Sequence, residues 1–327
     1  MFKNSKCLVT GGTGMIGRQV VDILVEMNAN VTSVSLDNLQ LNPNAQYKTI
    51  NLAYFEQCLE LTRNIDYIFH VAGIKGNARV TQEMPASFLV PLLQMNTNIL
   101  EASRVKKVKG IVYVSSIGAY PRPIEGRAIT EAEAVMSFTQ YPPMDFYPGW
   151  AKRTGELQLR AYREQYNYNN FAIVYPSNVY GPGDNFDPQN GMVIPSLMAK
   201  IRRGDDPIEV LGRGIDVRDF AFSKDVANGI IQAMLKAIRG EWGFWNLGGA
   251  IASIQTVVEI LRSITHCNFQ FKGNGTQSRR IMDSSKAMKE LGYNITALDI
   301  GLRQTWDWFN NHSDEYYQLK NYFREAT

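Results

Sequence analysis

The sequence has few of the residues that bind transition metals or form disulfides. Its 327 residues include three histidines and three cysteines. These are scattered, without the CxxC or HxxxH spacing of metal-binding motifs. The scarcity argues against a zinc site, an iron–sulfur cluster and a disulfide framework, so we predict that no metal is bound. The cysteines are expected to be reduced and mostly buried, as in a cytoplasmic protein.

An excess of one charge and long apolar runs are missing too. Lys plus Arg total 34 and Asp plus Glu total 31, a net charge of +3. The clustered basic residues of a nucleic-acid-binding protein are not present. No apolar stretch reaches the ~18–20 residues of a membrane span, and no targeting segment is visible. We therefore expect neither nucleic acid nor a membrane as a partner.

The N-terminal half alternates short apolar runs with amphipathic segments. The runs have strand length and are apolar throughout, which is typical of strands buried on both faces. They are Cys7–Thr10, Val31–Leu36, Tyr67–Val71, Gly110–Ser115 and Phe171–Tyr175. Helical segments lie between them, at Arg18–Met27, Phe55–Thr62, Pro85–Lys106 and Trp150–Tyr166. Such alternation predicts an α/β fold with a doubly wound parallel Rossmann sheet.

The pattern becomes irregular after Pro176, with many Gly, Pro and Asn residues and helices near Ile194–Arg203 and Asp225–Lys236. We therefore predict a Rossmann domain at residues 1–175. Residues 176–327 are expected to form mainly a smaller C-terminal lobe. Segments near 215–240 are expected to return to the main domain.

A glycine-rich loop, Gly11-Gly-Thr-Gly-Met-Ile-Gly17, follows the first strand and opens a helix. Its glycines let the backbone approach a pyrophosphate, whose charge the helix N-terminus stabilises. Asp37 stands 20 residues beyond Gly17, at the end of the second strand. A carboxylate there accepts both hydroxyls of an adenosine ribose and repels a 2′-phosphate, which favours NAD over NADP. Arg18 could reach a 2′-phosphate, although the first helical turn is also a routine place for a solvated Arg.

With these features the chain resembles the extended short-chain dehydrogenase/reductases of the NAD-dependent epimerase/dehydratase family. Within it, the chain is most similar to the GDP-L-fucose synthases and related nucleotide-sugar enzymes. The matching segments are Thr10–Gly17, Asp37-Asn-Leu, Phe69–Gly73, Val114-Ser-Ser116, Lys152, Pro176–Phe186, Val193-Ile-Pro195, Leu211–Gly214, Arg218-Asp-Phe220 and Arg279–Asp283. The resemblance covers nearly the whole chain.

The resemblance implies NAD in the N-terminal domain and a nucleotide-diphosphate sugar, GDP-linked, under the C-terminal lobe. It also implies a homodimer formed through the helices Pro85–Lys106 and Trp150–Tyr166. The implied cofactor-binding residues are Gly11, Gly14, Met15, Ile16, Gly17, Asp37, Asn51, Leu52, Ala72, Gly73, Lys152 and Pro176. The implied substrate-binding residues are Asn178, Val193, Arg218 and Arg280, of which the two arginines suit a diphosphate because guanidinium binds phosphate through two bonds.

The chemistry of the resembled family rests on a Ser, a Tyr and a Lys, and only two of the three match. Ser116 and Lys152 stand at the expected places, but Pro148 stands four residues before Lys152, where the Tyr belongs. We expect Pro148 to be the first helical residue, which leaves Tyr147 outside the helix. Tyr147 is then either a substitute for the missing Tyr or a plain loop aromatic. Weaker substitutes are Tyr120 and Tyr141.

Two positions bear on the type of reaction. Gly118 and Met192 stand where the fucose synthase pattern has a Cys and a His that move protons at carbon, and Ile117-Gly118 stand where 4,6-dehydratases have an Asp–Glu pair. Neither departure leaves a group for carbon acid/base work. We therefore predict an NAD-dependent nucleotide-sugar oxidoreductase that transfers hydride at C4 of a GDP-linked sugar, as a dehydrogenase, a ketoreductase or a 4-epimerase. Its catalytic residues would be Ser116, Tyr147 and Lys152.

Two alternatives stay open. The first is a weakly catalytic or inactive regulatory protein that binds NAD and a nucleotide sugar, which the displaced tyrosine favours. The second is a GDP-L-fucose synthase-type epimerase/reductase whose acid/base groups have moved to other residues.

Overall fold

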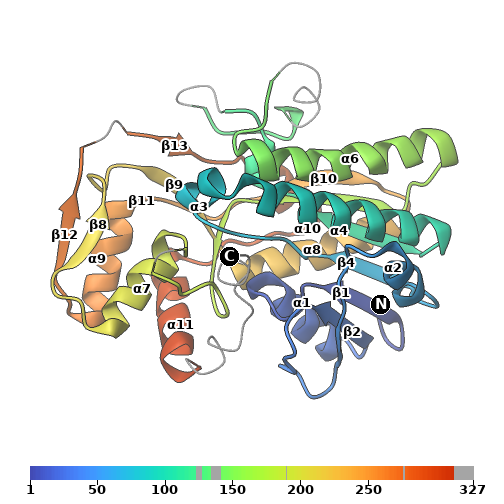
Figure 1. The fold of residues 1–327 in the computed structure, drawn as a ribbon, viewed down its shortest axis with the longest axis horizontal. Helices are drawn as coiled ribbons and strands as arrows, with labels where there is room; N and C mark the ends of the chain where they lie inside the picture. The colour runs from blue at the N-terminus through green and yellow to red at the C-terminus, as the bar shows by residue number, and fades with distance from the viewer. Residues whose placement is uncertain (123–126, 134–140, 189, 275–276, 313–327) are drawn as a thin grey trace.

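A parallel seven-stranded sheet forms the centre of the molecule (Figure 1). The structure is a computed structural model that describes residues 1–327 except 123–126, 134–140, 189, 275–276 and 313–327. The strand order is β10-β6-β5-β4-β1-β2-β3. The strands are β1 (Lys6–Thr10), β2 (Asn30–Ser35), β3 (Gln46–Thr49), β4 (Tyr67–His70), β5 (Gly110–Val114), β6 (Phe171–Pro176) and β10 (Gly243–Leu247). The predicted doubly wound Rossmann sheet is confirmed.

Helices cover both faces of this sheet, which explains why its central strands are apolar throughout. Residues of α1 (Met15–Glu26) and α8 (Ser223–Ile238) share one core with one face of the sheet. Residues of α2 (Phe55–Leu61), α4 (Pro85–Val105) and α6 (Phe146–Tyr166) share the core on the other face. The two long helices α4 and α6 pack against each other along that face (Figure 1).

The order of the strands places the ligand site. From β1 the chain runs outward to β2 and β3, and from β4 it runs outward in the other direction to β5, β6 and β10. In doubly wound sheets, ligands bind beyond the carboxyl ends of the strands at the point where this direction changes. The loops that follow β1 and β4 are therefore the expected floor of the site.

A second lobe carries two smaller sheets (Figure 1). The four-stranded sheet contains β7 (Asn178–Tyr180), β9 (Val217–Phe222), β11 (Ala250–Ser253) and β13 (Arg279–Arg280), and the two-stranded sheet pairs β8 (Ile208–Leu211) with β12 (Phe269–Lys272). Its helices are α7 (Val193–Arg203), α9 (Ile254–Thr265) and α11 (Leu298–Asn311). Aromatic and aliphatic residues of these elements form a core of their own. The remaining short helices are α3 (Ala78–Glu83), η1 (Ile117–Ala119) and α10 (Ser285–Leu291).

The chain returns to the large sheet over Ser223–Leu247, where α8 packs on β5 and β6 and β10 pairs with β6. β9 stays in the second lobe, although it lies inside the 215–240 segment that was expected to return. Its register explains this, since β9 pairs with β7, β11 and β13.

The start of α6 differs from the expectation that Pro148 is its first residue. The helix begins at Phe146, so Tyr147 and Pro148 are its second and third residues. Proline fits there because the first N–H groups of a helix have no partner within it, so its missing N–H costs no helical hydrogen bond. The expectation that Tyr147 lies outside the helix is therefore wrong.

Among the described residues, no helix is both long enough and apolar enough to cross a bilayer.

Candidate active site

The loops after β1 and β4 touch each other at the carboxyl edge of the sheet. The N–H of Ala72 donates to Thr10 Oγ1 at 3.1 Å. Gly11 has a φ of +69°, and a Cβ added to it would lie 2.8 Å from Ala72 Cα. Only glycine allows this backbone conformation and this approach without strain. The structure thus brings Gly11, Ala72 and Gly73 together beside the start of α1.

The glycine loop packs closely against the start of α1, whose first turn has no side-chain cap. A Cβ at Gly17 would lie 2.7 Å from Gly11 C, so this glycine lets the helix pack closely against the loop. At Gly14, the N-cap residue, the nearest described atom to an added Cβ is Gly11 O at 3.3 Å. The first turn has no acidic residue and no side-chain cap. Because first-turn N–H groups have no intrahelical acceptor, those of Met15 and Ile16 suit a pyrophosphate.

Asp37 is held at the end of β2 by a residue of the glycine loop. Thr13 Oγ1 donates to Asp37 Oδ2 at 2.7 Å, a contact that sequence reasoning missed. Arg18, which the sequence offered either as a contact to a 2′-phosphate or as a solvated arginine, is 6% exposed and not solvated. Its Nη2 donates to Thr13 O at 2.9 Å, and its guanidinium lies 5.0 Å from the ring centroid of Trp308 in α11. The second lobe therefore buries this arginine, which the sequence pattern alone did not indicate.

The loop after β3 holds Asn51 and Leu52. Asn51 Oδ1 accepts from Ala53 N at 3.0 Å. Asn98 of α4 donates from Nδ2 to the carbonyl oxygens of Leu52 at 3.0 Å and Ala53 at 2.9 Å. These bonds set the conformation of the segment that holds two of the predicted cofactor-binding residues, Asn51 and Leu52.

Lys152 reaches from α6 to the carboxyl ends of β4 and β5. Its Nζ donates to Val114 O at 2.8 Å, and a Cβ at Gly73 would lie 3.7 Å from the same nitrogen. The side chain is only 8% exposed. Burial lowers the pKa of Lys152 to about 8, although the negative charge of Glu156 acts in the opposite direction. Lysine and Gly73, both predicted to contact the cofactor, thus lie side by side.

Ser116 follows β5 as the N-cap residue of η1. Its Oγ accepts from Gly118 N at 3.1 Å. Because the oxygen accepts this bond, the hydroxyl proton stays available to donate to a ligand. Ser116 therefore keeps the hydrogen-bonding capacity that its predicted role requires.

Glu156 lies one helical turn after Lys152 and is buried. Tyr175 OH donates to its Oε2 at 2.8 Å, and the hydroxyl of Ser115 donates to its Oε1. Burial raises the pKa of Glu156, while the bonds from Ser115 and Tyr175 act against that rise. This carboxyl joins α6 to the strand end that carries Ser116. Its spacing of four residues from Lys152 was the available signal, which sequence reasoning did not use.

His70, at the end of β4, is buried between two polar groups. Its Nδ1 lies 2.8 Å from Thr10 Oγ1, and its Nε2 lies 2.9 Å from Asn96 Oδ1 of α4. Burial lowers the pKa of His70 to about 3. The ring is therefore neutral at physiological pH. Its two polar contacts connect β4 with β1 and α4.

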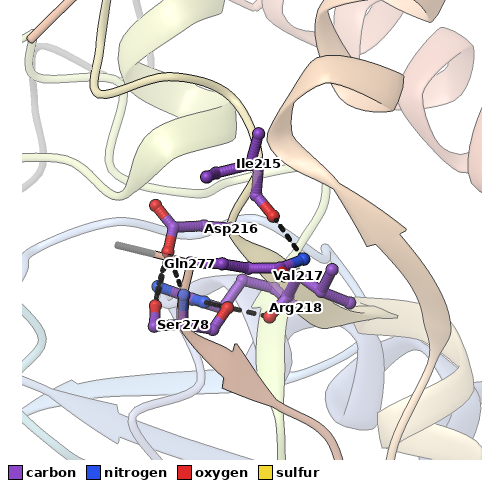
Figure 2. Close-up of polar contacts among 6 residues, drawn as sticks. All are labelled: Ile215, Asp216, Val217, Arg218, Gln277 and Ser278. Carbon is purple, nitrogen blue, oxygen red and sulfur yellow. Dashed lines mark hydrogen bonds and ion pairs between the residues drawn. The ribbon is translucent and has the colours of Figure 1, made fainter. Parts of the chain in front are cut away.

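Two arginines lie side by side on the second lobe, because Arg218 of β9 and Arg280 of β13 are directly paired in the strand register. Arg218 Nη1 donates to Val217 O at 2.9 Å and Ser278 O at 3.0 Å, and its Nη2 donates to Ser278 Oγ at 2.8 Å (Figure 2). Burial lowers the pKa of Arg218. Two neighbouring guanidinium groups form a suitable site for a diphosphate.

Figure 2 shows what holds Arg218 in place. Asp216 Oδ1 accepts from Ser278 N at 2.9 Å, and Gln277 Nε2 donates to Ile215 O at 3.1 Å. The segment before β13 is thereby tied to the segment before β9.

The other predicted substrate residues lie around the same lobe. Asn178, the first residue of β7, donates from Nδ2 to Asp219 O at 3.0 Å. Val193 is the first residue of α7 and is half-buried. Pro176 ends β6, two residues before Asn178.

Asp219 joins three segments at the junction between the two lobes. It is buried, and its Oδ1 accepts from Ser177 Oγ at 3.0 Å and from Gly249 N. Its Oδ2 accepts from Met282 N at 3.0 Å. Burial raises the pKa of Asp219 to about 6. In the sequence, Asp219 was only part of a motif. In the structure, its carboxylate connects the segments that contain Ser177, Gly249 and Met282.

Within the part of the chain that the structure describes, no group of three or more His, Cys, Asp or Glu residues is arranged to hold a metal ion.

The comparison with known families identifies the family of the chain. The sequence model of the NAD dependent epimerase/dehydratase family matches residues 7–248. The chain belongs to this family. Its members are enzymes, and as a group they are epimerases and reductases of nucleotide sugars.

Two curated relatives match this epimerase/dehydratase family member over most of their length. GDP-L-fucose synthase 1 of Arabidopsis thaliana is 28% identical over 318 residues, which cover 94% of each chain. The dTDP-4-dehydro-6-deoxy-D-allose reductase of Streptomyces bikiniensis is 28% identical over 323 residues, covering 94% of this chain and 96% of that relative.

Solved structures share the fold. The UDP-glucose 4-epimerase of Thermotoga maritima, determined with UDP-glucose, superimposes with a TM-score of 0.79 at 25% identity and covers 94% of this chain and 99% of its own. The UDP-glucose 4-epimerase of Thermus thermophilus, in complex with NAD, gives 0.80 at 22% identity, covering 93% and 99%. A GDP-L-fucose synthetase of Naegleria fowleri bound to NADP gives 0.78 at 22%, covering 96% of both chains.

This family member differs from the expected Ser–Tyr–Lys arrangement at its tyrosine. Tyr147 is 40% exposed, and its ring packs at 5.2 Å against the ring of Phe146. On an ideal helix Tyr147 points about 140° away from Lys152, five residues later. Among the described contacts, no hydrogen bond joins Tyr147 to Ser116 or Lys152. The structure does not bring this predicted catalytic residue to the other two.

The weaker substitutes are also placed elsewhere. Tyr120 is buried, and its hydroxyl donates to Asn246 Oδ1 at 2.7 Å. Burial raises the pKa of Tyr120 well above its usual value, which opposes formation of a phenolate. Tyr141 is exposed.

Proposed function

We propose that this protein is an NAD-dependent nucleotide-sugar oxidoreductase that transfers hydride at C4 of a GDP-linked sugar. The observation that carries the proposal is the position of Lys152, whose Nζ lies beside Gly73 and the end of β5. Ser116 follows the same strand end. Both residues therefore stand at the carboxyl edge of the sheet, next to the glycine loop.

The residues present fit a dinucleotide. The open first turn of α1 offers N–H groups to the pyrophosphate, and Asp37 offers its carboxylate to the adenosine ribose. Lys152 would hold the nicotinamide ribose. When bound, the nicotinamide supplies the hydride acceptor or donor.

Two observations support NAD rather than NADP. The carboxylate of Asp37 would repel a 2′-phosphate. Arg18, the cation nearest to the glycine loop in sequence, is held by the carbonyl of Thr13 and the ring of Trp308. It would have to leave both contacts to bind a 2′-phosphate. The family contains both preferences, since structures of similar fold carry NAD or NADP.

The paired arginines support a nucleotide-diphosphate sugar as substrate. Arg218 and Arg280 would bind the diphosphate, Arg280 through the N–H groups that do not face Asp145. Asn178 and Val193 would complete the substrate site. The similarity to GDP-L-fucose synthase 1 of Arabidopsis thaliana supports a GDP-linked sugar.

The reaction proposed is redox at C4, which includes dehydrogenation, keto-reduction and 4-epimerisation through transient oxidation. Gly118 and Met192 have no group that exchanges a proton with carbon. The absence of a proton-exchanging group at these two positions supports hydride chemistry over epimerisation at C3 or C5.

A homodimer in the cytoplasm completes the proposal. The pair α4 and α6 forms one layer of the molecule. Val90 of α4 and Leu157 of α6 are half exposed on that layer. Apolar residues on the outside of paired helices support a second copy as their partner.

A cofactor and substrate screen tests this function. The purified protein is incubated with NAD or NADH and a series of nucleotide sugars and their 4-keto forms, and nicotinamide absorbance is followed. We expect hydride transfer with a GDP-linked sugar. Lys152→Met should lower kcat by about 10²- to 10⁴-fold, because the lysine orients the ribose and stabilises the developing charge.

The control is Lys289→Met, which removes an exposed lysine of α10 and should leave kcat unchanged. Hydride transfer that survives in Lys152→Met at the wild-type rate would contradict the proposed site. Binding of NAD and nucleotide sugar without turnover in the wild type would instead identify the regulatory alternative, which the exposure of Tyr147 favours.

A further inference from the structure

The carboxylate of Asp145 occupies the space beside Gly118, two residues beyond Ser116. A Cβ added to Gly118 would lie 3.0 Å from both Cβ and Cγ of Asp145, and closer still to Oδ2. Asp145 N also donates to Gly118 O at 3.1 Å. A side chain at position 118 and the carboxylate of Asp145 are therefore alternatives for one volume. In this chain the glycine leaves that volume to the carboxylate.

The local sequence explains why the carboxylate lies there. Asp145 is the N-cap residue of α6, and an N-cap Asp usually accepts a hydrogen bond from the second or third N–H of its helix. The third helical residue is Pro148, which has no N–H. Asp145 accordingly makes no side-chain cap bond. The proline that replaces the expected tyrosine also removes a donor that would have engaged this carboxylate.

Asp145 stands just before the first turn of α6, so helical spacing does not set its direction. Its backbone is extended, with φ −100° and ψ 91°. Its N–H donates to Gly118 O, and its carboxylate lies beside Gly118. Tyr147, inside the helix, points about 140° away from Lys152 on an ideal helix. The contacts with Gly118 therefore place the carboxylate of Asp145, and a face of α6 does not.

Arg280 faces this carboxylate from β13. Its Nη1 lies 3.4 Å from Asp145 Oδ1, and both side chains are partly exposed. The ion pair orients the carboxylate. A charged carboxylate accepts hydrogen bonds but cannot donate them, which matches a role toward a ligand hydroxyl.

We propose that Asp145 accepts the proton of the reacting sugar hydroxyl, in place of the family tyrosine. The inference rests on the proposed oxidoreductase function. In the oxidative direction, the C4–H bond breaks and its electron pair leaves with the hydrogen to NAD. The O–H bond breaks at the same carbon, its electrons form the C=O bond, and the proton passes to a carboxylate oxygen of Asp145. Ser116 donates a hydrogen bond to the same sugar oxygen, and Arg280 holds the second carboxylate oxygen.

The test uses the full-length protein with NAD and the nucleotide sugar that the wild type oxidises. Asp145→Asn keeps the size and polarity of the side chain but cannot take the proton. We expect kcat to fall by about 10²- to 10⁴-fold, the usual contribution of a general base, with the KM for NAD unchanged. The acid limb of the pH profile of kcat/KM should disappear. Asp145→Glu should restore part of kcat.

Glu164→Gln, an exposed change on the same helix, is the matched control and should retain the wild-type rate and pH profile. A purely structural ion pair would show a lower melting temperature in Asp145→Asn with the acid limb intact, and this result would overturn the inference. So would a loss of kcat in Tyr147→Phe that exceeds the loss in Asp145→Asn.

Two further outcomes separate this inference from the function on which it rests. If the wild type transfers hydride and Asp145→Asn does so at the same rate, the inference alone is wrong. If the wild type transfers no hydride to or from any nucleotide sugar, both are wrong. Solvent deuterium that enters C3 or C5 in the wild type but not in Asp145→Asn would assign the carboxylate to carbon, and would contradict the hydroxyl assignment.

Discussion

The glycine loop and the start of α6 lie at the same edge of one sheet but work by different means. In the loop, the proposed binding relies on backbone N–H groups and close packing, and side chains at Gly11 and Gly17 would collide with neighbouring backbone. At the start of α6, the proposed chemistry relies on side chains, and the expected tyrosine is absent while a carboxylate lies close by. If the proposal holds, a backbone site tolerates little substitution, whereas a side-chain role can be taken over by a neighbouring residue.

The largest effect should come from a methyl group in the loop. Gly17→Ala places a Cβ 2.7 Å from Gly11 C and 2.8 Å from Gly12 Cα, so the loop and α1 must separate. We expect NAD affinity to fall more than about 100-fold and stability to fall by about 1–3 kcal/mol, as for an overpacked core. Calorimetric titration with NAD and thermal unfolding measure the two effects.

Gly204→Ala is the control for this change. Its φ is +86° and no atom lies within 4 Å of an added Cβ, so it carries backbone strain without a steric clash. It should cost about 1 kcal/mol and leave NAD binding intact. Normal NAD binding by Gly17→Ala would contradict the idea that this loop works through its backbone.

A smaller effect is expected at Asp37, where a side chain takes part in the loop site. Asp37→Asn can still accept the bond from Thr13 but loses the charge that we propose binds the ribose hydroxyls and repels a 2′-phosphate. We expect NAD affinity to fall about tenfold, the loss of one charged hydrogen bond, and the preference for NAD over NADP to narrow. Asp307→Asn on the exposed face of α11 is the control. An unchanged ratio of NAD affinity to NADP affinity would show that Asp37 does not select the cofactor.

The smallest effect concerns the charge environment of α6. Lys152 has a pKa of about 8, so activity that needs its charge should decline as pH rises through about 8. Glu156 raises that pKa, so Glu156→Gln should move the basic limb of kcat/KM to lower pH, by less than about one pH unit. The pH profile measures the shift, with Glu164→Gln as control. A limb that stays in place would show that Glu156 does not influence Lys152, and a limb that moves to higher pH would contradict the predicted sign.

Regular patterns made some features predictable. Apolar strand runs indicated the Rossmann sheet because parallel strands are buried on both faces, and the glycine spacing indicated the turn before α1. Both are local signals. The fold of the second lobe was largely missed, because strands such as β13 have only two residues and owe their pairing to contacts with distant segments.

Side-chain environments at the reaction side were less predictable. Pro148 suggested a helix that starts at this residue, but α6 begins two residues earlier. Proline is tolerated at the third position because the first N–H groups of a helix have no partner within it. Arg18 suggested a solvated side chain, but Trp308, almost 300 residues later, covers it. Glu156 offered only its four-residue spacing from Lys152 as a signal, and Asp219 offered no separate sequence signal of burial.

The sequence by itself determined the central sheet, the glycine-rich loop and the residues absent from their expected places, because each depends on residues close together in the chain. Tertiary structure decided where the side chains of the proposed reaction site lie. Gly118 and Asp145 are 27 residues apart and share one volume only because η1 packs against the start of α6. Arg280 reaches the same carboxylate only because β13 pairs with β9. Such juxtapositions arise from packing between distant segments, which no local pattern encodes.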